Sequence, residues 1–271
     1  MSQATEYTTV EYLICQAARL FEDQKTVFVG YGMPQIAAIL AQRLYAPQII
    51  QVYEYGAIGP EVVTPFRRNM MADARNSYRA YAWTGMNPIV WQAQAGLIDY
   101  GVLGAAQLDP WGNINSTMIG GTYERPGKRF TGSGGGNEVA SLCWRTVILM
   151  NHQKRRFLEK IDYVTSPGYL DGSPGARERA GLPRGTGPYR VISSMGVFDF
   201  PAETRRMRLT GLAPGCTADR LLEEMCFAPD VAPSIETLDP PRPDELRLLR
   251  EEIDPDRVVI GRVGMRPAAD V

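Results

Sequence analysis

Short apolar segments alternate with amphipathic, helix-like segments at the start of the chain. Residues 8–22 begin with a Thr-x-x-Glu capping box and then repeat apolar side chains at helical spacing. Residues 26–29 indicate a short buried strand, residues 34–44 a helix that a proline opens, and residues 49–53 a second strand. Strands that are apolar along almost their whole length are typical of parallel sheets with both faces covered. The alternation therefore predicts an α/β fold built on an open, mostly parallel sheet flanked by helices.

The same alternation continues through most of the chain. It predicts further helices over residues 89–96, 218–226 and 243–252, a helix close to residues 140–144, and strands over residues 99–103, 146–150 and 162–165. Residues 189–193 and 196–200 are expected to pair as a small antiparallel element near the C-terminal third, because a tight turn separates them. No linker divides the sequence, so we expect a single domain over residues 1–271, with an acidic helical extension from about residue 215.

Composition and overall charge exclude several classes of protein. The chain has 271 residues, of which 44% are hydrophobic, and this is enough for a sizeable core. A formal net charge of −1 supplies no field that would attract nucleic acid or a membrane surface. No apolar run reaches the roughly 18 residues of a membrane span, and the first residues lack the basic and apolar regions of a signal peptide. We therefore expect a cytoplasmic protein that binds neither nucleic acid nor membrane.

The cysteines and the single histidine limit the chemistry further. The cysteines, at positions 15, 143, 216 and 226, are not spaced as metal ligands, and one histidine cannot form a ligand pair. We interpret the cysteines as reduced and mostly buried, and we expect no metal site.

Charged residues are distributed unevenly along the chain. Residues 124–160 contain eight Lys or Arg and three Asp or Glu, whereas residues 219–256 contain twelve Asp or Glu and four Arg. The basic segment favours an anionic ligand, although its triplet at residues 154–156 is more typical of a solvated surface than of a phosphate site. The acidic segment is typical of solvated helix faces, or of a surface that meets a basic patch on a partner.

A glycine run lies inside the basic segment. Residues 132–136 read Gly-Ser-Gly-Gly-Gly and stand between a basic stretch and an apolar strand, which is not the setting of a flexible linker. Closely spaced glycines allow the backbone to approach a ligand and to direct successive N–H groups at one point. Such a nest suits a phosphate or a developing oxyanion. A tight structural turn explains the glycines equally well at this stage.

Two short segments directly follow the first two predicted strands. Glu54 follows the strand over residues 49–53, and ligands of parallel α/β sheets bind at the carboxyl ends of strands. A carboxylate there serves as a nucleophile, as a general base, or as a strand-end cap or salt bridge, and position alone favours the last interpretation. Gly30 and Gly32 stand between a strand and a helix N-terminus, where anions bind well. The third glycine of a dinucleotide fingerprint is missing, so we expect no nicotinamide cofactor.

Two further sets of polar residues allow both a functional and a structural interpretation. Residues 107–117 form a dense cluster of turn formers in which Asn113, Asn115 and Ser116 either position a ligand or satisfy loop backbone, and the structural interpretation is favoured. His152 follows a predicted strand and is a possible general base, but a lone histidine is more often a packed, hydrogen-bonded residue.

These segments together resemble the β-type (B) subunits of class I coenzyme A transferases, and within that family the glutaconate CoA-transferase type. The resemblance covers residues 8–200 well and returns near the end of the chain. The motifs that carry it lie at residues 45–47, 54–56, 104–117, 129–135, 154–157, 161–168 and 251–255.

The resemblance implies an enzyme with an open α/β fold that works with a separate α subunit, with the active site between the two. It implies that Glu54 attacks an acyl-CoA thioester, and no histidine is needed for this because a carboxylate is already ionised at neutral pH. An acyl-glutamyl anhydride and then a glutamyl-CoA thioester follow, and coenzyme A passes to a carboxylate acceptor. Coenzyme A is thus a substrate, no tightly bound cofactor is expected, and the acyl group is expected to be dicarboxylic or related.

The resemblance also assigns residues around the nucleophile. It implies an oxyanion hole at Gly134 and Gly135, whose N–H groups would stabilise the attacked thioester. Further substrate or coenzyme A contacts are expected from Gly30, Gly32, Tyr55, Asn113, Asn115, Ser116, Gly132 and Ser133.

Tyr55 departs from the family pattern, in which a small or amide residue follows the glutamate. A bulky phenol beside the nucleophile is expected to narrow the acyl pocket or to donate a hydrogen bond to the carboxylate. Two alternatives therefore stay open. One is an acyl-CoA hydrolase or a carbon–carbon bond-cleaving enzyme, ring-opening or decarboxylating, in which Glu54 activates water. The other is a non-catalytic scaffold subunit whose partner carries the catalytic residues. The presence of Glu54 favours transfer over these alternatives.

Overall fold

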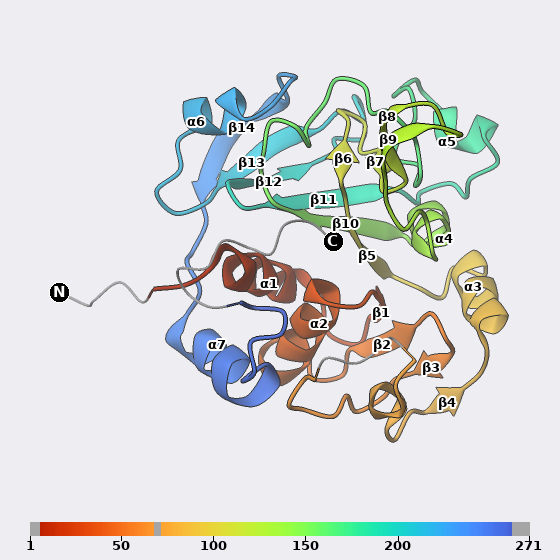
Figure 1. Cartoon of the computed structure of the whole chain (residues 1–271), viewed down its shortest axis with the longest axis vertical. Helices are drawn as coiled ribbons and strands as arrows, with labels where there is room; N and C mark the ends of the chain where they lie inside the picture. The colour runs from red at the N-terminus through yellow and green to blue at the C-terminus, as the bar shows by residue number, and fades with distance from the viewer. Residues whose placement is uncertain (1–5, 68–71, 262–271) are drawn as a thin grey trace. The chain divides into compact units, whose positions relative to one another are not determined.

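The computed structural model describes residues 6–67 and 72–261, which divide into two compact units (Figure 1). The first unit comprises the described residues up to Gln92 and those from Pro240 onward. The second unit comprises Ala93–Asp239. Helix α3, Met86–Gln94, includes the point at which the chain leaves the first unit.

A small mixed sheet and the helices around it form the first unit. Its elements in chain order are α1 (Thr9–Leu20), β1 (Thr26–Val29), α2 (Met33–Leu44), β2 (Ile50–Tyr53), β3 (Ala57–Ile58), the 3₁₀ helix η1 (Ala74–Ser77), β4 (Ala82–Trp83), α7 (Pro243–Arg247) and the π-helix η2 (Leu248–Ile253). Strands β1 and β2 are parallel, and β3 and then β4 extend the sheet in antiparallel pairs. Helices α1 and α2 pack against each other, and their apolar faces are buried.

Helix α1 begins with the predicted capping box. The backbone N–H of Glu11 donates to Thr8 Oγ1 (3.1 Å), and the N–H of Thr8 donates to Glu11 Oε2 (2.7 Å). These bonds satisfy N–H groups that the start of a helix otherwise leaves without a partner. The fully buried Glu11 side chain also pairs with Arg250 of η2 at 2.6 Å, so the C-terminal helices are tied to the first helix.

A second buried ion pair fixes α7 in the same unit. The Glu245 side chain is fully buried and pairs with Arg19 of α1 at 2.6 Å, and the Tyr45 hydroxyl donates to it as well. Burial alone would raise the pKa of Glu245, but the hydrogen bonds from Arg19 and Tyr45 outweigh it and lower that pKa. Part of the acidic segment is therefore internal, and the expectation of solvated helix faces is wrong for Glu245.

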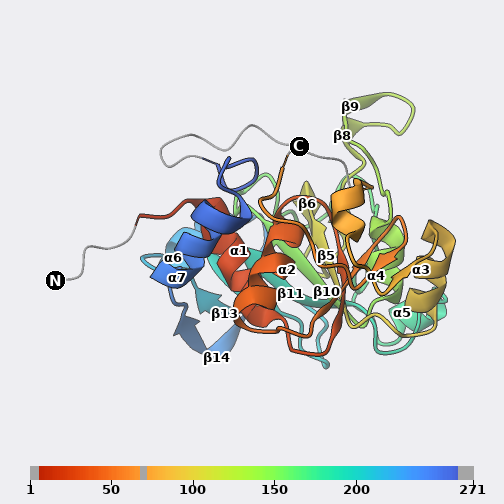
Figure 2. The same cartoon turned by 90° about the horizontal axis from the view of Figure 1, so that it is seen from below.

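A larger mixed sheet forms the second unit. Its elements are β5 (Tyr100–Gly104), β6 (Gln107–Leu108), β7 (Ile114–Asn115), β8 (Met118–Gly121), β9 (Pro126–Arg129), α4 (Gly136–Leu142), β10 (Arg145–Met150), α5 (Ala176–Arg179), β11 (Pro188–Ser193), β12 (Gly196–Asp199), β13 (Arg208–Leu212), α6 (Ala218–Glu223) and β14 (Asp230–Thr237). The sheet has the order β14-β13-β12-β11-β10-β5, with β10 parallel to both β5 and β11. Strands β6 and β7 form one separate hairpin, and β8 and β9 form another that extends outward from its unit (Figure 2).

Apolar side chains of the central strands make the core of the second unit. Ile148 of β10, Val191 of β11, Phe198 of β12 and Leu209 of β13 are completely buried and belong to one cluster with Phe157. Burial of each large apolar side chain contributes about 1.5–3 kcal/mol to folding. This core gives the loops at the ends of the strands a rigid base.

The α/β class predicted from the alternation is confirmed, and so is the antiparallel pair at residues 189–193 and 196–200, which are β11 and β12. The strand predicted over residues 162–165 is wrong. These residues form an irregular loop in which Tyr163 and Val164 are exposed and Thr165 is buried, so the apolar residues of the segment do not form a buried strand.

The segment expected to be helical from about residue 215 also contains a strand. Strand β14, at Asp230–Thr237, lies at one edge of the sheet, and most of its side chains are partly or fully exposed. An edge strand of this kind lacks the apolar run that announces a central strand. The single domain expected over the whole chain stays a prediction.

Candidate functional site

In the first unit, the candidate nucleophile lies at the carboxyl end of a parallel strand. Val29 at the end of β1 is paired with Tyr53 at the end of β2. Gly30 and Glu54 are therefore the first residues beyond the paired ends of two adjacent parallel strands. This edge of a parallel sheet is where α/β proteins bind ligands.

A tight turn holds Glu54 and Tyr55 at its two central positions. The turn closes where the N–H of Gly56 donates to the carbonyl of Tyr53 at 2.9 Å. Gly56 has a φ of +123°, and a Cβ at this position would lie 2.4 Å from the carbonyl oxygen of Thr84. Only glycine fits this close approach, which explains the glycine of the Glu-Tyr-Gly motif.

The Glu54 side chain is half-buried. Within residues 6–67 and 72–261, its carboxylate makes no hydrogen bond or ion pair. The strand-end cap and the salt bridge, which position alone favoured, are therefore not found in this part of the chain. A carboxylate without a structural partner remains available for chemistry.

Tyr55 presents its ring to two other aromatic side chains. Its centroid lies 5.8 Å from that of Tyr53 and 5.9 Å from that of Trp83, which is largely exposed. The Tyr55 hydroxyl is buried and has no hydrogen-bond partner among the described residues. Burial raises the pKa of Tyr55 to about 12, so its phenol is neutral at physiological pH. Tyr55 thus contributes an aromatic wall beside Glu54.

Gly32, which follows Gly30 beyond the end of β1, leaves open space at the same edge. Gly32 adopts a φ of +88° and directly precedes α2, and nothing lies within 4 Å of a Cβ built there. The space around Gly32 is therefore not filled by the described protein atoms, while its backbone conformation favours glycine. Gly30 and Gly32 lie where the sequence predicts a ligand contact.

In the second unit, the glycine run forms an open loop before α4. Gly132 has a φ of +90° and Gly134 a φ of +48°, and a Cβ at either would meet no atom within 4 Å. Gly135 follows with a φ of −78° and a ψ of 4°. This alternation of backbone hand turns successive N–H groups to one side, as in a nest. The N–H groups of Gly134 and Gly135 have no hydrogen-bond partner within the described residues.

Neighbouring loops hold the glycine run in place. Ser116 accepts from the N–H of Gly132 through its carbonyl (3.1 Å) and donates from its hydroxyl to the Gly132 carbonyl (3.0 Å). Its own N–H donates to Thr165 Oγ1 (2.9 Å). At the other end, Ser133 Oγ accepts from the N–H of Asn137, whose side chain donates to the Thr165 carbonyl. Ser116 and Ser133 therefore act on the shape of the loop.

A pocket of about 620 Å³ adjoins this loop. Its lining residues are Thr117, Tyr123, Arg129, Phe130, Thr131, Gly132, Ser133, Asn137, Tyr163, Val164 and Thr165. The sequence analysis identified Gly132 and Ser133 but missed Tyr123, Arg129 and Tyr163. The basic composition of the segment was the available signal for Arg129, whereas the exposed tyrosines carry no signal of their own.

Asn113 and Asn115 lie in the interior of the second unit. Both are at most 3% exposed. Asn113 donates to Asp109 and to the Leu170 carbonyl at 2.7 Å each, and Asn115 donates to Gln107 at 2.6 Å. These bonds show the structural role that the sequence analysis favoured, and a contact of either residue with a ligand stays a prediction.

His152 is buried in the core of the second unit. Its ring stacks on Phe157 at 4.3 Å and lies 6.1 Å from Phe198. Because a carbonyl can only accept, His152 Nε2–H donates to the Leu221 carbonyl at 3.1 Å. Burial lowers the pKa of His152 to about 4. The interpretation of His152 as a packed, hydrogen-bonded residue is therefore confirmed, and its buried position does not suit a general base.

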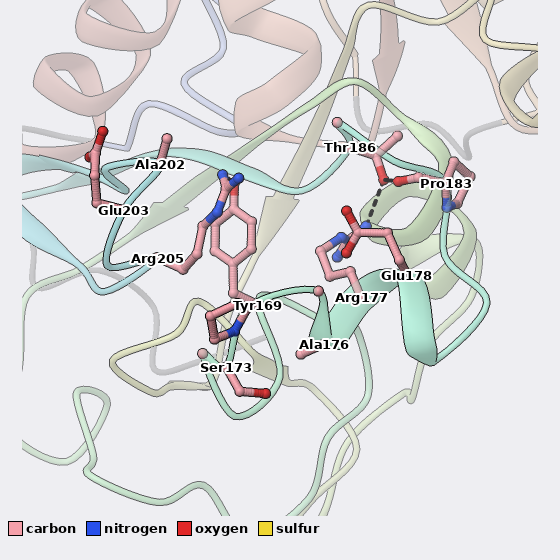
Figure 3. A pocket seen from close by; sticks show the side chains of 14 residues that line it. Tyr169, Ser173, Ala176, Arg177, Glu178, Pro183, Thr186, Ala202, Glu203 and Arg205 are labelled. Atoms are coloured by element: carbon pink, nitrogen blue, oxygen red, sulfur yellow. Dashed lines mark hydrogen bonds between the residues drawn. The ribbon is translucent and has the colours of Figure 1, made fainter.

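A second pocket, of about 180 Å³, lies around α5 in the same unit (Figure 3). Arg177, only 4% exposed, points inward there and donates to Thr186 (Figure 3). Its other acceptors are the carbonyl oxygens of Ala140, Ser141, Pro167 and Gly168. Burial lowers the pKa of Arg177 to about 10, so it stays charged at neutral pH. This guanidinium pins the last turn of α4 to two loops.

The described residues contain no group of three or more His, Cys, Asp or Glu side chains that could hold a metal ion. In the same ranges, no helix is both long and apolar enough to cross a membrane.

Comparison with known proteins identifies relatives over almost the whole chain. Residues 10–224 match the coenzyme A transferase family. The chain is 40% identical to the B-type subunit of glutaconate CoA-transferase from Acidaminococcus fermentans, covering 96% of this chain and 97% of that one. It is 33% identical to the B-type subunit of 3-oxoadipate CoA-transferase from Pseudomonas knackmussii, covering 90% and 92%. The crystal structure of glutaconate coenzyme A-transferase from A. fermentans matches with a TM-score of 0.88 at 37% identity, over 96% of this chain and all of that chain.

A more distant relative has a different chemistry in its name. The cholesterol ring-cleaving hydrolase IpdB subunit of Mycobacterium tuberculosis is 29% identical, covering 92% of this chain and 95% of that one. The family match extends over most of the chain, and the two nearer of these relatives are subunits of named transferases. The chain therefore belongs to the coenzyme A transferase family and is an enzyme subunit of the B type.

Proposed function

We propose that this chain is the β subunit of a CoA transferase in which Glu54 is the nucleophile. One observation carries the proposal: a carboxylate without a structural partner among the described residues stands at the carboxyl end of β2, in a turn that only glycine can close. In the first step a Glu54 carboxylate oxygen attacks the thioester carbonyl of an acyl-CoA. The carbon–sulfur bond breaks, coenzyme A leaves as the thiolate, and an acyl-glutamyl anhydride remains.

The next steps transfer coenzyme A through the enzyme. The thiolate attacks the glutamyl carbonyl of the anhydride, the carbon–oxygen bond breaks, and the donor leaves as a carboxylate. The resulting glutamyl-CoA thioester is attacked by the acceptor carboxylate, and the same two steps in reverse order form the new acyl-CoA and regenerate Glu54. Every step exchanges a carboxylate and a thiolate, so no histidine or metal is needed to balance protons.

Each tetrahedral intermediate carries an oxyanion that needs prearranged donors. We assign this role to the N–H groups of Gly134 and Gly135, because no described residue accepts from them and their backbone alternates in hand. Loss of one such donor typically slows an enzyme by about 10²–10³-fold.

The relatives support a proposal for the substrates and the partner. Glutaconate and 3-oxoadipate are both dicarboxylates, so we propose a dicarboxylic acyl-CoA as donor or product and a carboxylate as acceptor. Both relatives are subunits of the B type, so we propose an α subunit as partner, with the active site shared between the two chains.

A trapping experiment on the purified αβ complex tests the nucleophile. Incubation with acyl-CoA and then hydroxylamine or borohydride should modify Glu54, which mass spectrometry locates on its peptide. The Glu54→Ala variant should show neither modification nor transfer. Glu54→Asp should be slower by about 10²-fold, since the shorter arm misplaces the attack by roughly 1 Å. Full transfer activity of Glu54→Ala would end the proposal.

Hydrolysis is the second candidate, and the aromatic wall at Tyr55 together with the IpdB relative favours it. Here Glu54 would act as a base on water. The discriminating assay measures where coenzyme A appears. Strict dependence of thioester consumption on an added carboxylate excludes hydrolysis, whereas free coenzyme A formed without any acceptor excludes transfer as the main reaction.

A further inference from the structure

The pocket beside the glycine run has an aromatic and basic wall that the proposed acyl transfer does not use. The wall comes from the β8–β9 hairpin, which extends outward from the second unit (Figure 2), and from the loop around Tyr163. The two segments lie far apart in the sequence, and the pocket exists because they fold together.

A column of one cation and two aromatic rings forms this wall. The guanidinium of Arg129 lies over the Tyr123 ring at 4.5 Å, and it also donates to the Tyr123 carbonyl. The Tyr123 and Tyr163 rings are stacked with centroids 5.8 Å apart and planes at 30°. Tyr123 is 55% exposed and Tyr163 is 37% exposed, so the column is accessible to a ligand. Stacked, exposed tyrosines are the platforms on which proteins bind nucleobases.

The charge of the hairpin suits an anionic ligand. Its turn and second strand contain Arg125, Lys128 and Arg129 against a single acid, Glu124. Arg129 is exposed and lines the pocket, and Lys128 lies over the Phe130 ring at 4.8 Å. The nearby Asp162 carboxylate accepts from Gln107 and from the N–H of Gly120. Among the described residues that line the pocket, Arg129 is the only charged side chain, and arginine is well suited to bind phosphate.

The size of the pocket distinguishes a nucleotide from an acyl chain. A volume of about 620 Å³ lies in the range of sites that hold whole cofactors or drug-sized ligands, about 300–1,000 Å³. A short dicarboxylic acyl group has few heavy atoms and no ring to stack. It would use neither the volume nor the two tyrosines.

We propose that this pocket binds the adenosine phosphate end of the acyl-CoA substrate. The adenine stacks on the Tyr123–Tyr163 pair, and Arg129 pairs with the phosphates. The inference rests on the proposed function for its choice of nucleotide. It adds a site for the non-reacting end of the substrate, whose binding energy holds the thioester in the active site.

Comparison of full and truncated substrates tests the site in the αβ complex. Tyr163→Ala and Arg129→Gln should each lower kcat/KM for the acyl-CoA by about 10- to 100-fold. With the corresponding acyl-pantetheine, which lacks the nucleotide, each variant should match the wild-type complex. Tyr163→Phe keeps the ring and should restore most of the activity that Tyr163→Ala loses. Arg220→Gln removes an exposed arginine of α6 outside the pocket lining and is the matched control that should behave like the wild type.

The same assay shows the results that would overturn the proposal. Equal losses with acyl-CoA and acyl-pantetheine would show that the column does not contact the nucleotide. A loss in Arg129→Gln that persists with the pantetheine thioester and disappears with a monocarboxylic acyl group would place the distal carboxylate of the acyl chain at Arg129 instead.

A binding measurement separates this proposal from the proposed chemistry. Adenosine 3′,5′-bisphosphate should bind the αβ complex in a calorimetric titration, and equally well when the complex carries Glu54→Ala. Tyr163→Ala should weaken this binding by about 10-fold or more. Absence of binding to the wild-type complex would overturn the nucleotide site, even if Glu54 proves to be the nucleophile. Binding in a complex whose transfer does not depend on Glu54 would overturn the proposed mechanism and support the nucleotide site.

Discussion

At the scale of single residues, the turn after β2 requires the glycine of the Glu-Tyr-Gly motif and leaves the residue beside Glu54 open to change. Gly56 is required by its φ of +123° and by the carbonyl of Thr84. Glu54 and Tyr55 are half-buried, and the hydrogen bond that closes the turn is made by the backbone of Tyr53 and Gly56. The Tyr55 ring rests on Tyr53 and Trp83. The identity of residue 55 is therefore free to adjust the space beside Glu54 without changing the turn.

This freedom gives a prediction for Tyr55. Tyr55→Phe removes a buried hydroxyl that has no partner in the described ranges, so unfolding free energy should be unchanged or slightly higher, and activity should persist. Tyr55→Asn removes the aromatic wall and should raise kcat/KM for bulkier acyl-CoA substrates relative to short ones. Substrate profiles of the two variants check this. Identical profiles for Tyr55→Asn and wild type would show that the ring does not bound the acyl site.

At the scale of elements, the glycine loop and α4 take their geometry from side chains elsewhere in the sequence. Ser116 fixes the first glycine of the run through two hydrogen bonds, and Arg177 binds the carbonyls at the end of α4. Glycines by themselves are flexible, and the free energy of ordering them is supplied by these contacts. Both contacts are between segments remote in sequence.

Ser116→Ala tests the first contact. Its hydroxyl donates to the Gly132 carbonyl, and a hydrogen bond of this kind contributes about 1 kcal/mol. Because the loop would lose order at the assigned oxyanion donors, kcat should fall about 5- to 10-fold with little change in KM. Ser173→Ala, which alters a surface loop of the same unit, is the matched control. A change in KM alone would instead indicate that Ser116 contacts bound substrate.

Arg177 gives a stability prediction at the same scale. Arg177→Ala leaves several buried carbonyl groups without a donor and should lower the unfolding free energy by about 3 kcal/mol. Arg179→Ala on the same short helix removes an exposed arginine and should cost less than about 1 kcal/mol. Urea unfolding of both variants measures the difference. Equal effects would show that Arg177 does not anchor α4.

At the scale of the whole molecule, the packed core of the second unit makes the stability depend on pH. His152 is the only histidine of the chain, and its pKa is lowered to about 4 by burial, from an ordinary value of 6.5. A lowered histidine pKa means that the unfolded chain binds the proton first as the pH falls. Its contribution to stability is therefore fully present above pH 6.5 and is lost progressively as the pH falls toward 4.

His152→Phe should remove this dependence. Between pH 7 and pH 4, the unfolding free energy of the wild type should fall by about 3 kcal/mol relative to that of His152→Phe. Burial raises the pKa of Asp109 to about 6, so its effect on stability over the same pH range is opposite to that of His152. Both proteins contain Asp109, and its contribution therefore cancels in the comparison. Urea unfolding at several pH values measures the two curves. Parallel curves would show that His152 titrates normally.

Local signals in the sequence determined much of this protein: the capping box at Thr8, the central strands, the position of Glu54 after a strand and the family itself. These features depend on neighbouring residues or on a motif read in order, so the sequence alone carries them. The edge strand β14, the Arg19–Glu245 pair and the wall formed by Arg129 and Tyr163 depended on the tertiary structure. Their partners are brought together by folding across long stretches of chain, and exposed or paired side chains leave no periodic pattern from which such contacts can be predicted.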